Sequence, residues 1–236
     1  MKVREALSEY PLEFAIYSLI SLVICVFTGI VYFSNPTVFI RFIGDVNPLL
    51  LIPVLAMAGF GIILFFFDRG WFRIFKRENL RGCLPTFIVA IILAFAMITV
   101  DLVSPFPEDT NVQFPLSLIF YPIMGYIVEI LFHLAPLALI LAIASSLFKQ
   151  VEQRKILWVG LIAVALLEPI YQMSWGIAAT QPIWQIAYTG IHVFMINFME
   201  LHNFKRYDFV SMYSFRLVYY LFWHIIWGLL RLSILF

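Results

Sequence analysis

Charged residues are scarce in this sequence. Only 12% of the 236 residues are Asp, Glu, Lys or Arg, whereas 63% are hydrophobic and 18% are aromatic. Soluble domains carry roughly 25% charged residues, so the composition excludes a water-soluble globular protein. The formal net charge of +1 also argues against a nucleic-acid partner, because such partners are bound by strongly basic surfaces.

Cysteine is nearly absent. Cys25 and Cys83 lie in or beside different hydrophobic runs and lack the spacing of metal ligands. The sequence therefore indicates neither a disulfide framework nor a zinc knuckle, and we expect both thiols to act as small apolar side chains. A small-residue cleavage site is also missing after the first hydrophobic run, so we expect the N-terminus to be retained.

Long hydrophobic runs, in contrast, are abundant and repeatedly exceed the roughly 18 residues that indicate a membrane span. Since lipid offers no hydrogen-bond partners to the backbone, these runs must be helices. We predict an all-α polytopic membrane bundle of about seven transmembrane helices, with six to eight as the range, forming one integral membrane domain over residues 1–236. The expected spans are 14–33, 48–67, 84–103, 116–148, 156–175, 183–204 and 209–232.

The fourth run is longer than one crossing requires, and Pro122 and Pro136 could kink it or split it into a hairpin. Charge placement favours a single crossing, because Lys and Arg concentrate in cytoplasmic loops. With seven spans, one side holds only Arg41 among basic residues, together with Asp45, Glu108 and Asp109. The other side, which we predict to be cytoplasmic and to contain the N-terminus, holds Lys2, Arg4, Arg69, Arg73, Lys76, Arg77, Arg81, Lys149, Arg154, Lys155, Lys205 and Arg206.

Residues 71–81 mix aromatic and basic side chains. Trp71, Phe72 and Phe75 lie there among four Lys and Arg residues of the set above, and the fifth, Arg69, directly precedes the segment. This pattern is typical of a segment on the inner membrane surface near anionic lipid, or of a simple topology anchor. The lipid bilayer, most simply the plasma membrane, is thus the first expected partner.

Polar residues inside the spans gather in the second half of the chain. A charge at the bilayer centre costs on the order of 2.5–3.5 kcal/mol even on lenient scales, so these residues indicate a polar interior. We expect helices of residues 1–110 to face lipid and those of 115–236 to bear the site. The polar residues are Glu129, His133, Glu168, Gln172, His192, Asn197, Glu200, Arg216, His224 and Arg231.

Depth along each span, counted at about 1.5 Å per residue, predicts which groups meet. Glu129, Glu168, His192 and His224 fall in one layer, as expected for a site between bundle helices. Glu129 and His133 are spaced i,i+4, so they can hydrogen-bond on one helix face.

Each of these residues also has a purely structural interpretation. The Glu129 and His133 pair could only fix helix packing, and Glu168 could satisfy backbone groups freed by Pro169. Arg216 could snorkel or pair with Glu200. Arg231, near the outer end, is expected to be an anchor.

The segment Val128-Glu129-Ile-Leu-Phe-His133 resembles the first motif of the CPBP family, which includes the bacterial Abi proteins and the glutamate intramembrane proteases that process CaaX proteins. That family carries Glu-Glu-x-x-x-Arg, then Phe-x-x-x-His, then a late helix with His-x-x-x-Asn. Glu129 matches the second Glu and His224 the late His. The departures are Val128 for the first Glu, His133 for Arg, Gln172 for the second-motif His and Gly228 for Asn.

The resemblance implies an intramembrane peptidase without a metal or other cofactor, acting on a peptide or membrane-protein substrate. Glu129 would activate water, and His224, His133, Gln172 and Glu168 would assist. Two alternatives stay open. His133, His192 and His224 with a carboxylate could bind zinc in a metal-dependent hydrolase. The Glu168-Pro169 step could instead mark a broken helix around the ligand site of a non-enzymatic transporter or scaffold.

Overall fold

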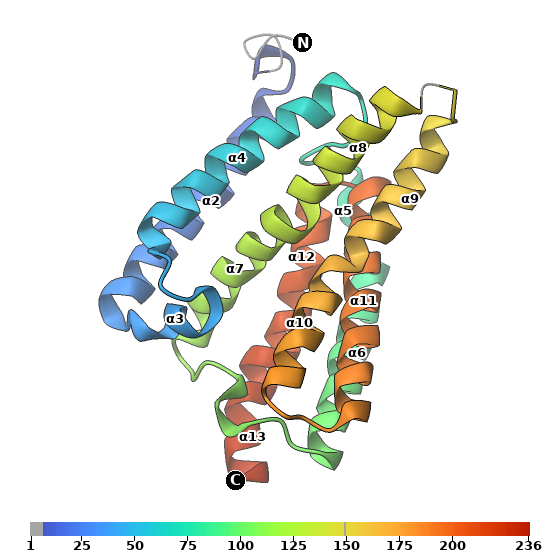
Figure 1. Ribbon diagram of the computed structural model, residues 1–236. Coiled ribbons are helices and arrows are strands. Elements are labelled where there is room, and N and C mark those ends of the chain that lie inside the picture. Colours follow the sequence, from blue (N-terminus) through green and yellow to red (C-terminus); the bar gives the residue numbers. More distant parts are fainter. Residues whose placement is uncertain (1–6, 149) are drawn as a thin grey trace.

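The computed structural model describes residues 7–148 and 150–236, and within them every regular element is a helix (Figure 1). The chain runs back and forth along one bundle, so that its first and last described residues lie at opposite ends of the bundle (Figure 1). The main helices are α2 (Pro11–Ser34), α3 (Thr37–Ile43), α4 (Pro48–Asp68), α5 (Asn79–Gly82), α6 (Leu84–Val103), α7 (Ser117–Val128), α8 (Ala135–Leu147), α9 (Gln153–Ala165), α10 (Leu167–Ala178), α11 (Ile183–Arg206), α12 (Phe209–Tyr220) and α13 (Gly228–Leu235).

Two π-helical segments and a short 3-10 helix complete the order. The π segments are η2 (Glu129–Leu134), between α7 and α8, and η3 (Leu221–Trp227), between α12 and α13. The 3-10 helix η1 (Glu108–Thr110) lies in the loop after α6. Widened turns of the π type occur often at functional sites, and here they carry Glu129, His133 and His224.

Six helical runs are long and apolar enough to cross a membrane, which confirms the predicted integral membrane bundle. They are Pro11–Ser34, Pro48–Asp68, Asn79–Val103, Ser117–Leu147, Gln153–Ala178 and Phe209–Leu235. Each matches one of the seven predicted spans.

The seventh predicted span, 183–204, is the helix α11, but it is less apolar than the other six. It has 24 residues and packs against α6, α9, α10 and α12. Its buried face carries Gln185, His192, Asn197, Glu200 and Asn203. These polar side chains account for the lower hydropathy of α11, and they are buried in the bundle.

The fourth run passes through the bundle once. The elements α7, η2 and α8 follow one another in line from Ser117 to Leu147 (Figure 1). Pro122 lies inside α7 without ending it, and Pro136 lies in the first turn of α8, directly after the π segment. The predicted single crossing is therefore confirmed over a hairpin. At 31 residues, the run is about 46 Å long, so it must tilt or extend beyond a ~30 Å hydrocarbon layer.

The fifth run is broken at Leu166, between α9 and α10. Pro169 has no N–H to donate to the carbonyl of Ala165, four residues earlier. The Nδ2 atom of Asn197 donates to that carbonyl instead, at 3.4 Å. The Ala165 carbonyl that Pro169 leaves free is thus satisfied by Asn197 of α11. The structural interpretation that gave this role to Glu168 is therefore wrong.

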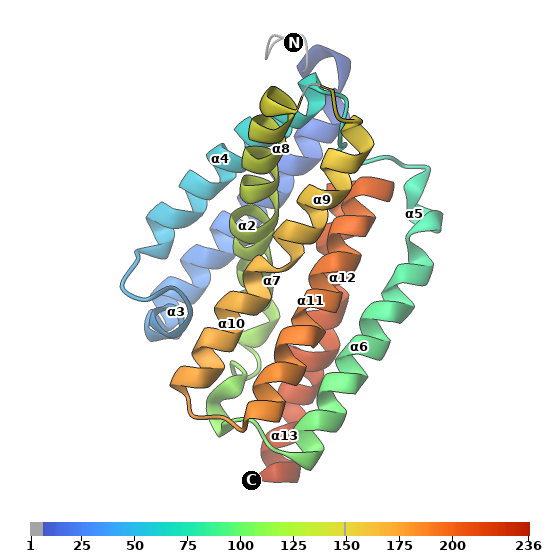
Figure 2. The same ribbon diagram turned by 45° about the vertical axis from the view of Figure 1, so that its right-hand side comes forward.

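Basic residues gather at the end of the bundle where α2 begins, which we call the N-terminal end. There α4 ends, α9 begins and α11 ends, whereas the loop after α6 lies at the opposite end, near α13 (Figure 2). The described segment between α4 and α6 at this end contains Arg69, Arg73, Lys76, Arg77 and Arg81. Lys2, Arg4 and Lys149 lie outside the described residues. The arrangement agrees with the charge alternation that underlies the predicted orientation.

The loop after α4 is fixed to the protein at Glu13. The carboxylate of Glu13 accepts hydrogen bonds from the Arg73 guanidinium and from the backbone N–H groups of Ile74, at 2.9 Å, and Phe75, at 3.2 Å. This hydrogen bond raises the pKa of the Arg73 guanidinium, so Arg73 stays cationic. The aromatic and basic stretch is therefore anchored to α2.

A second carboxylate fixes the same loop to α12. Asp208, the N-cap of α12, accepts from the backbone N–H of Lys76, at 2.9 Å, and from Asn79 Nδ2, at 2.8 Å. Phe72 stacks on Phe204 with ring centroids 4.2 Å apart. The loop thus ties the N-terminal helices to the second half of the chain.

The helices α2 and α4 pack on each other and leave an apolar outer face. A Cβ atom added to Gly59 of α4 would overlap the hydroxyl of Tyr17, so glycine permits this close approach. The exposed side chains include Leu19, Leu22 and Val26 on α2 and Leu50, Val54 and Met57 on α4. This face fits the lipid-facing role predicted for residues 1–110.

Candidate functional site

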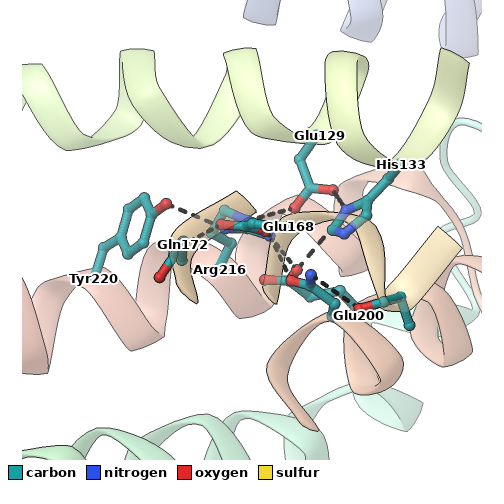
Figure 3. Close-up of polar contacts among 9 residues, drawn as sticks. Glu129, His133, Glu168, Gln172, Glu200, Arg216 and Tyr220 are labelled. Atoms are coloured by element: carbon teal, nitrogen blue, oxygen red, sulfur yellow. Dashed lines mark hydrogen bonds and ion pairs between the residues drawn. The ribbon is translucent and has the colours of Figure 1, made fainter. Parts of the chain in front are cut away.

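Five ionisable side chains form a buried cluster around Arg216 in α12 (Figure 3). We call it the Arg216 cluster. Its members come from η2, α10, α11 and α12, and none exposes more than 5% of its side chain. They are Glu129, His133, Glu168, Glu200 and Arg216.

Arg216 joins the three carboxylates. Its Nε donates to Glu129 Oε1 at 3.0 Å. Its Nη2 donates to Glu200 Oε2 at 2.5 Å and to Glu168 Oε2 at 3.2 Å. The same guanidinium reaches Asn197 Oδ1, at 3.2 Å, and the Tyr220 hydroxyl, at 3.1 Å. One planar fork of donors therefore fixes three helices against α12.

Glu129 and His133 lie one turn apart on η2 and bond to each other, as their spacing predicted. His133 Nδ1 lies 2.6 Å from Glu129 Oε2, so both carboxylate oxygens of Glu129 are held, one by an imidazole and one by Arg216. Of the two structural interpretations of Arg216, the structure shows the ion pair with Glu200. Glu129 is thus rigidly oriented inside the bundle.

The cluster is not balanced in charge. Three carboxylates face one guanidinium, which leaves two formal negative charges when His133 is neutral and one when it is protonated. Two buried atoms, His133 Nε2 and Glu200 Oε1, have no hydrogen-bond partner among the described residues. Since buried polar atoms nearly always find a partner, these two atoms are candidates for binding a substrate, an ion or a proton.

Ligand atoms for a metal ion come together in a set that the sequence did not predict. One oxygen each of Glu129 and Glu200 and one nitrogen of His133 lie within 4.8 Å of one another. The predicted histidine set is not brought together. His192 Nε2 lies 3.2 Å from the hydroxyl of Tyr219, and His224 bonds elsewhere.

His224 lies beyond the Arg216 cluster, toward the C-terminal end. Its Nδ1 lies 2.7 Å from Asn111 Oδ1, and its ring stacks on Tyr121 at 4.4 Å. The predicted line of Arg216, Tyr220 and His224 does exist, because the Tyr220 ring lies 4.9 Å from that of His224. Two helical turns rise about 11 Å, however, so the end of the line leaves the layer where it began.

Gln172 forms its hydrogen bond with Glu168 and not with Glu129. Its Nε2 donates to Glu168 Oε1 at 2.9 Å. Of the four groups expected in one layer, Glu129 and Glu168 meet at Arg216, whereas His192 and His224 do not. Counting residues from helix ends fails here because the fifth run is broken and two runs contain π turns.

A second buried arginine pairs with an aspartate that sequence reasoning missed. Arg231 is fully buried and donates from Nε to Asp101 Oδ2, at 2.7 Å, and from Nη2 to Asp101 Oδ1, at 2.9 Å. The expected role of Arg231 as a membrane anchor is therefore wrong. The available signal was Asp101 itself, an ionisable residue near the end of the predicted span 84–103.

Comparison of the chain with protein-family models, with curated proteins and with solved structures gives no match.

Proposed function

We propose that this protein is an intramembrane hydrolase, of the glutamate peptidase type, in which Glu129 activates water. The observation that carries this proposal is the position of Glu129, which is fully buried and held by both Arg216 and His133. The motif that Glu129 resembles places an arginine four residues later. His133 occupies that position here, and Arg216 of α12 supplies a guanidinium to Glu129 from another helix.

Glu129 can serve as base and then as acid. It would take a proton from the water that attacks an amide carbonyl and return it to the amine that leaves when the C–N bond breaks. Arg216 and Tyr220 provide donors beside Glu129 for charge that develops on the carbonyl oxygen. Because the cluster is closed, the reaction begins with separation of η2 from α10 and α11.

The expected substrate is a membrane-proximal peptide segment, cleaved in the plasma membrane. The test compares new protein N-termini in cell membranes that contain the wild type or Glu129→Gln, by mass spectrometry of terminal peptides. We expect new N-termini close to predicted spans of host membrane proteins with the wild type, and none with Glu129→Gln.

The matched control is Glu108→Gln, because the Glu108 side chain lies on an exposed loop outside the cluster. Each variant is also checked for a single symmetric elution peak in detergent, so that loss of folding is recognised. New N-termini that persist unchanged with folded Glu129→Gln would dismiss the hydrolase.

The second candidate is a non-enzymatic membrane protein that binds or carries a small cation. The enclosure and the two formal negative charges of the Arg216 cluster favour it, because an unbalanced buried charge is costly. A divalent cation held by Glu129, His133 and Glu200 would balance the cluster with His133 neutral.

Calorimetric titration of the purified protein with Zn²⁺ and Mn²⁺ tests this candidate. We expect one site per chain in the wild type and in Glu108→Gln, and none in Glu200→Gln. Absence of binding to the wild type would remove the second candidate and leave the hydrolase untouched.

A further inference from the structure

A groove of about 250 Å³ lies at the N-terminal end of the bundle, on the side where α8 and α9 meet. It shares no lining residue with the Arg216 cluster. Gly70 and Trp71, from the loop after α4, form one wall, and the last turns of α8 and the first turns of α9 form the others.

The base of this groove is apolar and its rim is polar. Leu141, Ile156 and Leu157 supply aliphatic surface, while Ser145, Gln153 and Arg154 supply hydrogen-bonding groups and one cation. A site with these two halves fits an amphipathic ligand. It fits a small soluble ion poorly, because an ion gains no contact energy from aliphatic side chains.

Positive potential converges on the rim from two elements. Arg154 is exposed in the first turn of α9, a helix of 13 residues whose N-terminal N–H groups add a partial positive charge. On the opposite wall, the Arg69 guanidinium lies over the Trp71 ring, 5.6 Å from its centroid. Glu152, the N-cap residue of α9, provides no side-chain capping bond. The rim therefore attracts an anion.

We propose that this groove binds an anionic phospholipid, with the phosphate at Arg154 and the start of α9 and an acyl chain along Leu141, Ile156 and Leu157. The location supports lipid as the source of the phosphate. The groove opens between spanning helices at the basic end of the bundle, where the charge pattern places the cytoplasmic leaflet and its anionic lipids. The lipid would link the loop after α4 to α8 and α9.

The test counts lipids that remain on the protein after purification from mixed membranes. The full chain is reconstituted in bilayers of equal phosphatidylcholine and phosphatidylglycerol, extracted in mild detergent and measured by native mass spectrometry. We expect phosphatidylglycerol to be retained over phosphatidylcholine by the wild type. Arg154→Gln should lower this retention about fivefold, the effect of one basic contact near a membrane surface.

The control variant is Arg41→Gln, which removes an arginine at the opposite end of the bundle, where it pairs with Asp109 at 3.3 Å. It should retain phosphatidylglycerol as the wild type does. Equal retention by Arg154→Gln and Arg41→Gln would overturn the proposal, as would equal retention of the two lipids. Displacement of phosphatidylglycerol by millimolar inorganic phosphate would also overturn it, because the site would then recognise free phosphate.

Discussion

The two buried arginines have opposite surroundings. Arg231 faces one carboxylate, Asp101, in bidentate geometry, and its remaining donors reach the carbonyls of Phe106, Pro107 and Glu108. Asp101 in turn accepts from the indole of Trp227 and the backbone N–H of Phe106. Arg216, in contrast, faces three carboxylates, and two polar atoms of its cluster have no partner among the described residues.

This difference indicates that Arg231 belongs to a structural ion pair, whereas Arg216 belongs to a candidate active site. At Asp101 and Arg231, charge is balanced and each donor and acceptor has a partner, so the pair joins α6, α13 and the loop after α6. In the Arg216 cluster, a neutral and saturated arrangement was available with fewer acids, yet three are present. Intramembrane ionisable residues that exceed structural need indicate function.

The largest loss of stability is expected for Arg216→Gln. This change leaves three carboxylates buried together without a cation, which should cost more than the roughly 3–5 kcal/mol of an ordinary broken buried pair. We expect little folded protein by fluorescence-detected size-exclusion chromatography. Adding Glu168→Gln and Glu200→Gln to the same chain should restore the folded peak, and failure to do so would contradict the charge argument.

Asp101→Asn should produce the next largest effect. It leaves Arg231 buried with its charge unpaired, at a cost of roughly 3–5 kcal/mol, or a fall in melting temperature of about 10 °C. Thermal unfolding in detergent measures it. A melting temperature within 2 °C of the wild type, on the order of 1 kcal/mol or less, would show that the pair is not structural.

Glu200→Gln should alter stability much less, although Glu200 is as buried as Asp101. The amide oxygen of Gln can still accept from Arg216, and one excess negative charge is lost. We expect a melting temperature equal to the wild type or higher, in the same thermal assay. A fall as large as that of Asp101→Asn would erase the contrast between the two arginines.

A loss of stability smaller than that of Asp101→Asn is expected at the N-terminal end, where Glu13 holds Arg73. Because Arg73 is partly exposed, Glu13→Gln should cost about 1 kcal/mol. The raised pKa of Arg73 means that its contribution is fully present below the usual arginine pKa and is lost only above it. The stability difference between wild type and Glu13→Gln should therefore stay constant from pH 7 to pH 10, measured by urea unfolding.

Most of the helical layout follows from local sequence. Hydrophobic length placed the helices, and charge placement decided that the run containing Glu129 crosses once. The i,i+4 spacing predicted the bond between Glu129 and His133. These features depend on residues that are close in sequence, where the 3.6-residue period fixes which side chains share a face.

Contacts between helices were harder to predict. Asp101 and Arg231 are separated by 130 positions, and nothing local indicates that they meet. His224 was expected at Glu129, but it follows Arg216 by two turns and bonds to Asn111 in a loop. Helix tilt, the break at Leu166 and the two π segments change which side chains face one another, and none of these can be derived from residue counting.

One paired measurement on Glu129→Gln tests the central claim that Glu129, within the Arg216 cluster, serves function more than stability. Thermal unfolding and the mass-spectrometric search for new N-termini are made on the same membranes. We predict a melting temperature close to that of the wild type together with complete loss of the new N-termini. A large fall in melting temperature with unchanged cleavage would contradict the account and make Glu129 a structural residue like Asp101.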